Sequence, residues 1–174
     1  VQHQIHRPAH DIQHVRASNG GFLVWAGEED LEGDGAAVSV VTLRSPGGEV
    51  VEIVRDRIEP DFVEGGLIWS TPDRRRILRA QFAVRDLEGL EETLIAEGGP
   101  EEQLRAFSTG DESEIVVVRT APDGVTVQRF DLEGRVASDA RALPAAGQGR
   151  APFVARHPRA DLYLVSAVDG PAQG

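Results

Sequence analysis

Hydrophobic and polar residues alternate along several short segments of the chain. Between residues 77 and 85, one side of an extended chain would carry apolar residues and the other polar ones: Leu78, Ala80, Phe82 and Val84 against Arg79, Gln81 and Arg85. A period of two is typical of a half-buried β-strand. Residues 86–96 could instead form a helix capped by Asp86, but Gly89 would weaken it by about 1 kcal/mol relative to Ala. We therefore expect a strand at residues 92–96 and little helix elsewhere.

Turn signals join these strands into hairpins. A β-branched run at residues 115–118 is followed by Ala121-Pro122-Asp123-Gly124 and then by a second run at 125–130. Proline presets φ at an early turn position and glycine accepts the positive φ that follows, so the pattern predicts a hairpin. The same signals predict two further hairpins: residues 38–43 with 50–54 around the turn at 45–48, and residues 161–165 with the segment after Gly170.

One segment of the chain repeats without gaps 38 residues later: GLIWSTPDRRRIL at 66–78 and LRAFSTGDESEIV at 104–116. The matching positions are Trp69 with Phe107, Ser70 with Ser108, Thr71 with Thr109, Asp73 with Asp111, and Ile77 with Ile115. Looser copies lie at 22–27 and 152–164. Each copy predicts a strand, a tight turn and a longer strand. Three or four antiparallel strands in about 40 residues make one propeller blade.

The segments IWSTPDRRRIL and AFSTGDESEIV resemble the bacterial β-propeller repeats typified by the TolB C-terminal domain and, more distantly, WD repeats. The resemblance implies an all-β fold of antiparallel, propeller-like repeats with three or four strands each. About four repeats are expected, the last incomplete, at residues 21–64, 65–102, 103–149 and 150–174. Residues 1–20 are expected as a His-containing arm or closing strand, in which residues 11–17 would complete the last repeat. A β-sandwich is the alternative, because many short strands with regular turns suit that fold too.

Composition excludes several classes of function. The chain has 29 acidic and 18 basic residues, a net charge of -11, and neither Lys nor Cys. This charge argues against a nucleic-acid surface, which needs a basic face. The absence of Lys and Cys excludes a P-loop lysine, Schiff-base chemistry, thiol nucleophiles and disulfides. No partner nucleic acid is therefore expected.

The sequence carries no signal for a membrane. No apolar run approaches the roughly 20 residues that span a bilayer. The first residues have neither the basic start nor the apolar middle of a secretory signal. We expect a soluble bacterial protein, either cytoplasmic or exported. Because it contains no Met, we expect it to be a processed product or part of a longer chain.

An acidic loop provides a candidate metal site. Asp30, Glu32 and Asp34 occupy positions one, three and five of a loop with Gly35 at position six. This alternation places carboxylate oxygens around calcium, and it resembles the loops of calcium-binding FG-GAP propeller repeats. Calcium is therefore the candidate cofactor. Positions nine and twelve are valines, which supply no ligand, so a solvated acidic loop is the alternative.

The N-terminal histidines form a second candidate. They are spaced by three or four residues: His3, His6, His10 and His14. Neutral imidazoles at such spacings can share a transition metal. The alternative is a terminal arm that binds metal incidentally.

A group of arginines forms the candidate partner-binding surface: Arg74, Arg75, Arg76 and Arg79. It directly precedes residues 86–114, where ten acidic residues accompany one basic residue. Arginine suits bidentate contact with carboxylates and the anchoring of interfaces. Ordinary balance of surface charge is the alternative.

The sequence favours a non-enzymatic role. It lacks a G-x-S-x-G nucleophile elbow, and its carboxylate pairs lie in segments expected to be solvated loops. We expect an interaction or scaffold module that binds another protein or the remainder of its own longer chain. One alternative is a calcium-linked or glycan-binding propeller. The other is a hydrolase whose site is completed by segments outside this chain.

Overall fold

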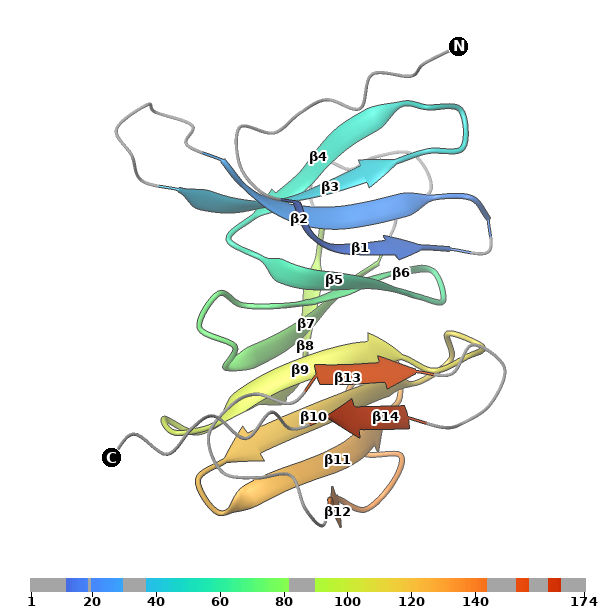
Figure 1. Cartoon of the computed structure of the whole chain (residues 1–174). Helices are drawn as coiled ribbons and strands as arrows, with labels where there is room; N and C mark the ends of the chain where they lie inside the picture. Colours follow the sequence, from blue (N-terminus) through green and yellow to red (C-terminus); the bar gives the residue numbers. More distant parts are fainter. Residues whose placement is uncertain are drawn as a thin grey trace.

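The computed structural model describes residues 12–18, 20–29, 37–81, 90–143, 153–156 and 163–166. The regular structure in these ranges is β-strand (Figure 1), as the alternating pattern predicts. The first sheet contains β1 (Ile12–Ala17), β2 (Leu23–Glu29), β3 (Val38–Arg44) and β4 (Val50–Arg55). The second contains β5 (Ile58–Val63), β6 (Gly66–Ser70), β7 (Arg76–Gln81) and β8 (Glu92–Glu97). The third contains β9 (Gln103–Ser108), β10 (Ile115–Ala121), β11 (Gly124–Phe130) and β12 (Arg141–Ala142), and β13 (Phe153–Arg156) pairs with β14 (Tyr163–Ser166).

The three four-stranded sheets are antiparallel meanders stacked one on another (Figure 1). In each sheet the strands are ordered as they occur in the chain. The first strands of successive sheets are in contact, β1 with β5 and β5 with β9. One edge of the stack is therefore built from β1, β5 and β9. No helix in the described residues has the length and apolar character needed to cross a membrane.

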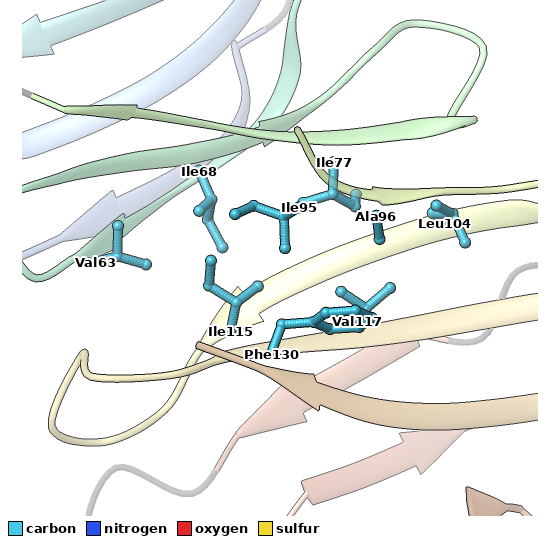
Figure 2. Packing of buried hydrophobic residues seen from close by; sticks show 9 residues of the cluster. All are labelled: Val63, Ile68, Ile77, Ile95, Ala96, Leu104, Ile115, Val117 and Phe130. Atoms are coloured by element: carbon cyan, nitrogen blue, oxygen red, sulfur yellow. The ribbon is translucent and has the colours of Figure 1, made fainter. Parts of the chain in front are cut away.

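The second sheet is buried on both faces. On β6, Leu67 and Trp69 pack into the core shared with the first sheet, whereas Ile68 packs into the core shared with the third. Figure 2 shows Ile68 and Ile77 facing Ile115 of the third sheet. A strand between two sheets needs apolar residues at successive positions, and all five residues of β6 are buried.

This double burial corrects the expected pattern of residues 77–85. Leu78 and Ala80 do share a face, toward the first sheet. The opposite face was expected to be polar, yet it carries the fully buried Ile77 and a half-buried Arg79, because the third sheet covers it. Residues 82–85 lie outside the described residues.

The repeated segments fold into nearly identical hairpins. Ser70 pairs with Ile77 and Ser108 with Ile115, so the ladder register repeats after the same 38 residues. In each turn the threonine Oγ1 donates to an aspartate Oδ1, from Thr71 to Asp73 at 2.5 Å and from Thr109 to Asp111 at 2.8 Å. The fourth residue of each turn has positive φ: 55° at Arg74 and 62° at Glu112. The sequence repeat therefore encodes a hairpin and its turn.

These two hairpins occupy different places in their sheets. β6 is the second strand of its sheet, whereas β9 is the first. The sheets accordingly span residues 12–55, 58–97 and 103–142. The expected boundary at residues 64 and 65 falls inside the β5–β6 turn. A matching hairpin thus does not by itself fix where a sheet begins.

The structure corrects the expected closing strand. Ile12–Ala17 pairs with β2 and is the first strand of the first sheet; it does not complete the last repeat. Other local predictions are confirmed: the hairpins β3–β4 and β10–β11, and the strand β8 in place of a helix. In the last hairpin, β14 pairs with β13, and the segment after Gly170 lies outside the described residues.

Candidate functional site: a charged cluster on the first strands

The first strands β1 and β5 carry matching β-bulges. The pairing register shifts between Gln13 and Arg16 on β1, and between Ile58 and Asp61 on β5. Within the bulges, His14 and Glu59 each have φ of 54°. A residue other than glycine with such a φ costs on the order of 1 kcal/mol, and bulges re-aim side chains. Both bulges direct an ionisable side chain toward a neighbouring strand.

Glu59 is the centre of the site. Its Oε1 accepts hydrogen bonds from Arg74 Nε at 3.2 Å and Nη2 at 3.0 Å. Arg105 Nε lies 3.4 Å from the same oxygen, and His14 Nε2 lies 3.7 Å from it. Glu59 is only 8% exposed. A carboxylate this buried needs opposite charge and hydrogen bonds, and the two arginines provide both.

Asp61 is the second carboxylate of β5 and faces β9. Its Oδ2 accepts a hydrogen bond from the amide of Ser108 at 3.0 Å, and its Oδ1 accepts one from the amide of Phe62 at 2.9 Å. Arg16 Nε of β1 lies 3.9 Å from Oδ1. Burial raises the pKa of Asp61, against the opposing effect of these amides and of Arg16. Asp61 therefore connects all three first strands.

We call this group the first-strand cluster; it comprises His14, Arg16, Glu59, Asp61, Arg74, Arg105 and Ser108. Burial lowers the pKa of His14; nearby arginines add to this effect, whereas Glu59 opposes it. At neutral pH, three guanidinium groups therefore face two carboxylates, in a chain whose net charge is -11.

The arrangement suits recognition of an anion. Arg105 Nε is buried and makes no hydrogen bond within the described part of the chain. Guanidinium groups bind carboxylates in a planar, often bidentate geometry. The cluster thus holds three guanidinium groups against two carboxylates, and Arg105 Nε is paired with Glu59 by charge at 3.4 Å without a hydrogen bond.

The structure separates the four arginines that the sequence grouped together. Arg74 joins the first-strand cluster. Arg75 Nη2 donates to the carbonyl of Pro100 at 2.9 Å. Arg76 pairs with Glu97 at 2.9 Å. Arg79 lies between sheets, where Nη2 donates to the Glu64 carbonyl at 3.0 Å and Nη1 to the Leu132 carbonyl at 3.4 Å. They do not form a single patch.

The sequence-predicted metal ligands are not brought together among the described residues. His14 contacts Glu59, whereas His3, His6 and His10 lie outside the described residues. Asp30, Glu32 and Asp34 also lie outside them, so the calcium site stays a prediction. In the ranges that the structure describes, no three His, Asp or Glu residues are placed to hold a metal ion.

Sequence reasoning missed Glu59, Asp61 and Arg105. A signal was present, because Ile58, Pro60 and Phe62 alternate with the two carboxylates over residues 58–62. Two carboxylates at every second position of an apolar strand indicate a charged face. What sequence could not supply was their partners, which come from three other elements.

Comparison with known proteins reveals the fold but not a family. No family model matches the chain, and no curated protein does. A solved structure of a nidogen/laminin complex matches with 14% identity and a TM-score of 0.59, over 83% of this chain and 52% of that chain. The β-propeller domain of the Trilobed protease from Pyrococcus furiosus, which has an open velcro topology, matches with 14% identity and a TM-score of 0.60, over 90% of this chain and 48% of that one. Prolyl oligopeptidase B from Galerina marginata matches with 10% identity and a TM-score of 0.59, over 87% of this chain and 22% of that one.

These likenesses define the class of fold as β-propeller. The three meanders and the two-stranded sheet do not close on themselves, which is consistent with an incomplete propeller. At 10 to 14% identity the comparisons do not single out the TolB-like or WD-like family. The chain spans about half the length of the first two matched chains.

Proposed function

We propose that this chain is a non-enzymatic interaction module whose first-strand cluster binds a carboxylate-bearing segment of a protein partner. One observation carries the proposal: Arg16, Arg74 and Arg105 come from three different elements and surround two carboxylates. Their side chains are 46%, 30% and 24% exposed. They are thus held in place by Glu59 and Asp61, yet accessible to a ligand.

The energetics favour an acidic ligand over a basic one. Positioned guanidinium groups lose little side-chain freedom on binding, which is the main benefit of preorganisation. Arg105 Nε faces Glu59 Oε1 at 3.4 Å, so a ligand carboxylate would contact the exposed part of the Arg105 guanidinium. A cationic ligand would have to displace these arginines from Glu59.

The test is calorimetric titration of the chain with a short oligo-glutamate peptide, in parallel with oligo-glutamine and oligo-lysine peptides of equal length. We expect binding of oligo-glutamate alone, weakening with added salt because partly exposed charges are screened. Binding of oligo-lysine, or of no peptide, would contradict the proposal.

Variants localise the binding. Arg105→Gln should weaken binding of oligo-glutamate by about tenfold, which corresponds to about 1.4 kcal/mol. The matched control is Arg135→Gln, because Arg135 is 76% exposed in a turn of the third sheet and does not contact the cluster. Equal losses in both variants would indicate non-specific attraction to arginine and would contradict a site on the first strands.

A further inference from the structure

The two carboxylates of the first-strand cluster hold their arginines differently. Glu59 Oε1 accepts two hydrogen bonds from Arg74, at 3.2 and 3.0 Å. Asp61 Oδ1, in contrast, lies 3.9 Å from Arg16 Nε, which is too long for a hydrogen bond. The side chain of Arg16 is also more exposed than those of Arg74 and Arg105. Arg16 is therefore the guanidinium group of the cluster that is most open to a ligand.

Asp61 receives its hydrogen bonds from neutral groups. The amide and the hydroxyl of Ser108 donate to Oδ2, at 3.0 and 3.4 Å, and the amide of Phe62 donates to Oδ1 at 2.9 Å. These bonds fix the carboxylate between β5 and β9 without help from Arg16, so Asp61 attracts Arg16 by charge alone. The site also suits a protonated carboxyl group, because the Ser108 hydroxyl can turn to accept a hydrogen bond from it.

The surroundings of Asp61 oppose its charge. Within the described part of the chain, Arg16 of β1 is the charged group that acts on it, while β9 supplies Ser108 and β5 itself supplies Phe62. The remaining charged groups of the cluster surround Glu59, two positions earlier on β5: His14, Arg74 and Arg105. Burial raises the pKa of Asp61, whereas Arg16 and the two amides act against this shift. Asp61 therefore gains its proton at a higher pH than an exposed aspartate would.

We propose that Asp61 competes with the ligand carboxylate for Arg16, so that the cluster binds its ligand more tightly when Asp61 is protonated. This inference rests on the proposed function, because it requires an acidic ligand. Two carboxylates beside one guanidinium group repel each other, and protonation of Asp61 removes this repulsion. Coupling between two binding events is reciprocal. A ligand that prefers protonated Asp61 therefore also promotes the uptake of a proton.

Proton uptake is measured on the parent chain. The oligo-glutamate peptide is titrated calorimetrically at pH 5.5 in two buffers whose ionisation enthalpies differ, and the difference in heat gives the number of protons taken up. We expect a net uptake on binding. Binding without uptake would overturn this inference and leave the proposed function standing. Absence of binding at every pH would contradict the proposed function as well.

Asp61→Asn assigns the coupling to this carboxylate. At pH 8 the variant should bind oligo-glutamate about tenfold more tightly than the parent, as expected when a ligand shifts the pKa of a neighbouring group by about one unit. The difference should narrow as pH falls to 5.5. Titration of the ligand's own carboxylates affects both chains and cancels in the comparison. Weaker binding by Asp61→Asn at pH 8, or a pH dependence equal to that of the parent, would overturn the inference; the second result would assign the coupling to His14.

A matched control and a second variant complete the test. Glu97→Gln removes a carboxylate that pairs with Arg76 at 2.9 Å outside the cluster, so it should bind like the parent at each pH. Arg16→Gln removes the group for which Asp61 competes, and it is tolerated more readily because Arg16 is 46% exposed. Its loss of affinity should be larger at pH 5.5 than at pH 8, because Arg16 is released by protonation of Asp61. Equal losses at both pH values would overturn the inference even if Asp61→Asn does not fold.

Discussion

β1 and β5 are both first strands with the same kind of β-bulge, but their environments differ. Both carry a bulge with a residue of positive φ, His14 in one and Glu59 in the other. Both are followed by an apolar residue, but Val15 is 52% exposed whereas Pro60 is fully buried. The difference comes from position in the stack, because β5 has a sheet on each side. Burial in this fold is thus decided by neighbours as much as by local pattern.

The two bulges also differ in charge, and this difference connects the sheets. The position occupied by a carboxylate in β5 is occupied by an imidazole in β1, and the two groups lie 3.7 Å apart. Likewise Arg16 aligns with Asp61, and these lie 3.9 Å apart. Equivalent positions on neighbouring first strands therefore carry groups that can attract each other.

Truncating equivalent leucines in the first and second sheets is the strongest test of how sheet stacking affects burial. Leu67 is fully buried between the first and second sheets, and Leu23 occupies the equivalent, half-buried position on the face of the first sheet that points away from the second. We expect Leu67→Ala to cost about 3 kcal/mol in unfolding free energy and Leu23→Ala about 1 kcal/mol. Urea denaturation at low protein concentration measures both. Equal costs would show that stacking does not determine the burial energy.

The next largest effect concerns the two bulge residues. Glu59→Gln leaves Arg74 and Arg105 close together without a carboxylate, so we expect a loss of about 2 kcal/mol, reduced from that of a fully buried pair because the arginines are partly exposed. His14→Gln should cost less than about 0.5 kcal/mol, since the imidazole lies only at the margin of the cluster. Urea denaturation measures both losses of unfolding free energy. A larger loss for His14→Gln than for Glu59→Gln would contradict the central position of Glu59 in the cluster.

Asp61 provides a pH test. Because burial raises its pKa in the folded state, the protonated form stabilises the fold. That contribution is complete below the ordinary carboxyl pKa and is lost as pH rises through the higher folded value. The stability of the parent relative to Asp61→Asn should therefore fall as pH increases above 4. A stability difference between the parent and Asp61→Asn that stays flat with pH would contradict the burial of Asp61.

His14 should respond in the opposite sense. Its pKa is lowered in the folded state, so its contribution is present above the ordinary imidazole value and is lost as pH falls through the folded one. The unfolding free energies of the parent and of His14→Gln, measured between pH 5 and 8, distinguish the contribution of His14 from that of Asp61.

The smallest effect is expected at the repeated turns. The hydroxyl of Thr109 lowers the pKa of Asp111 to about 2, with further hydrogen bonds from Ser113. Its stabilisation is therefore present above the ordinary value and is lost as pH falls toward 2. Asp73 has the same arrangement with Thr71, which also lowers its pKa. Asp111→Asn and Asp73→Asn should both lower the melting temperature slightly at neutral pH, Asp111→Asn by more because Asp111 also accepts hydrogen bonds from Ser113; a larger loss for Asp73→Asn would contradict this comparison of the turns.

Local structure was well predicted from the sequence. The Pro122-Asp123 hairpin, the Ser45–Gly48 turn and the repeated Thr-x-Asp turns were all predictable, because each depends on residues close in the chain. Placement of strands within sheets was less predictable. The match of residues 66–78 with 104–116 is a match of hairpins, and nothing local distinguishes a second strand from a first.

The candidate site was predicted only in part. Arg74 was identified because it belongs to a visible run of arginines, but Arg75 and Arg76 belong to the same run and form other contacts. Glu59 gathers its partners from β1, β9 and the β6–β7 turn, which are 15 or more residues away. Such convergence depends on how sheets stack, and residue spacing does not contain that information.

The bond from the Ser108 amide to Asp61 has a consequence for slow motions. This amide donates across from one sheet to the next, whereas most strand amides donate within their own sheet. Its deuterium exchange would therefore require the second and third sheets to separate locally, even while each meander stays intact. We expect the Ser108 amide to exchange faster than amides in the middle of β10, and its rate to change with the protonation of Asp61. That rate would then measure how often the second and third sheets separate.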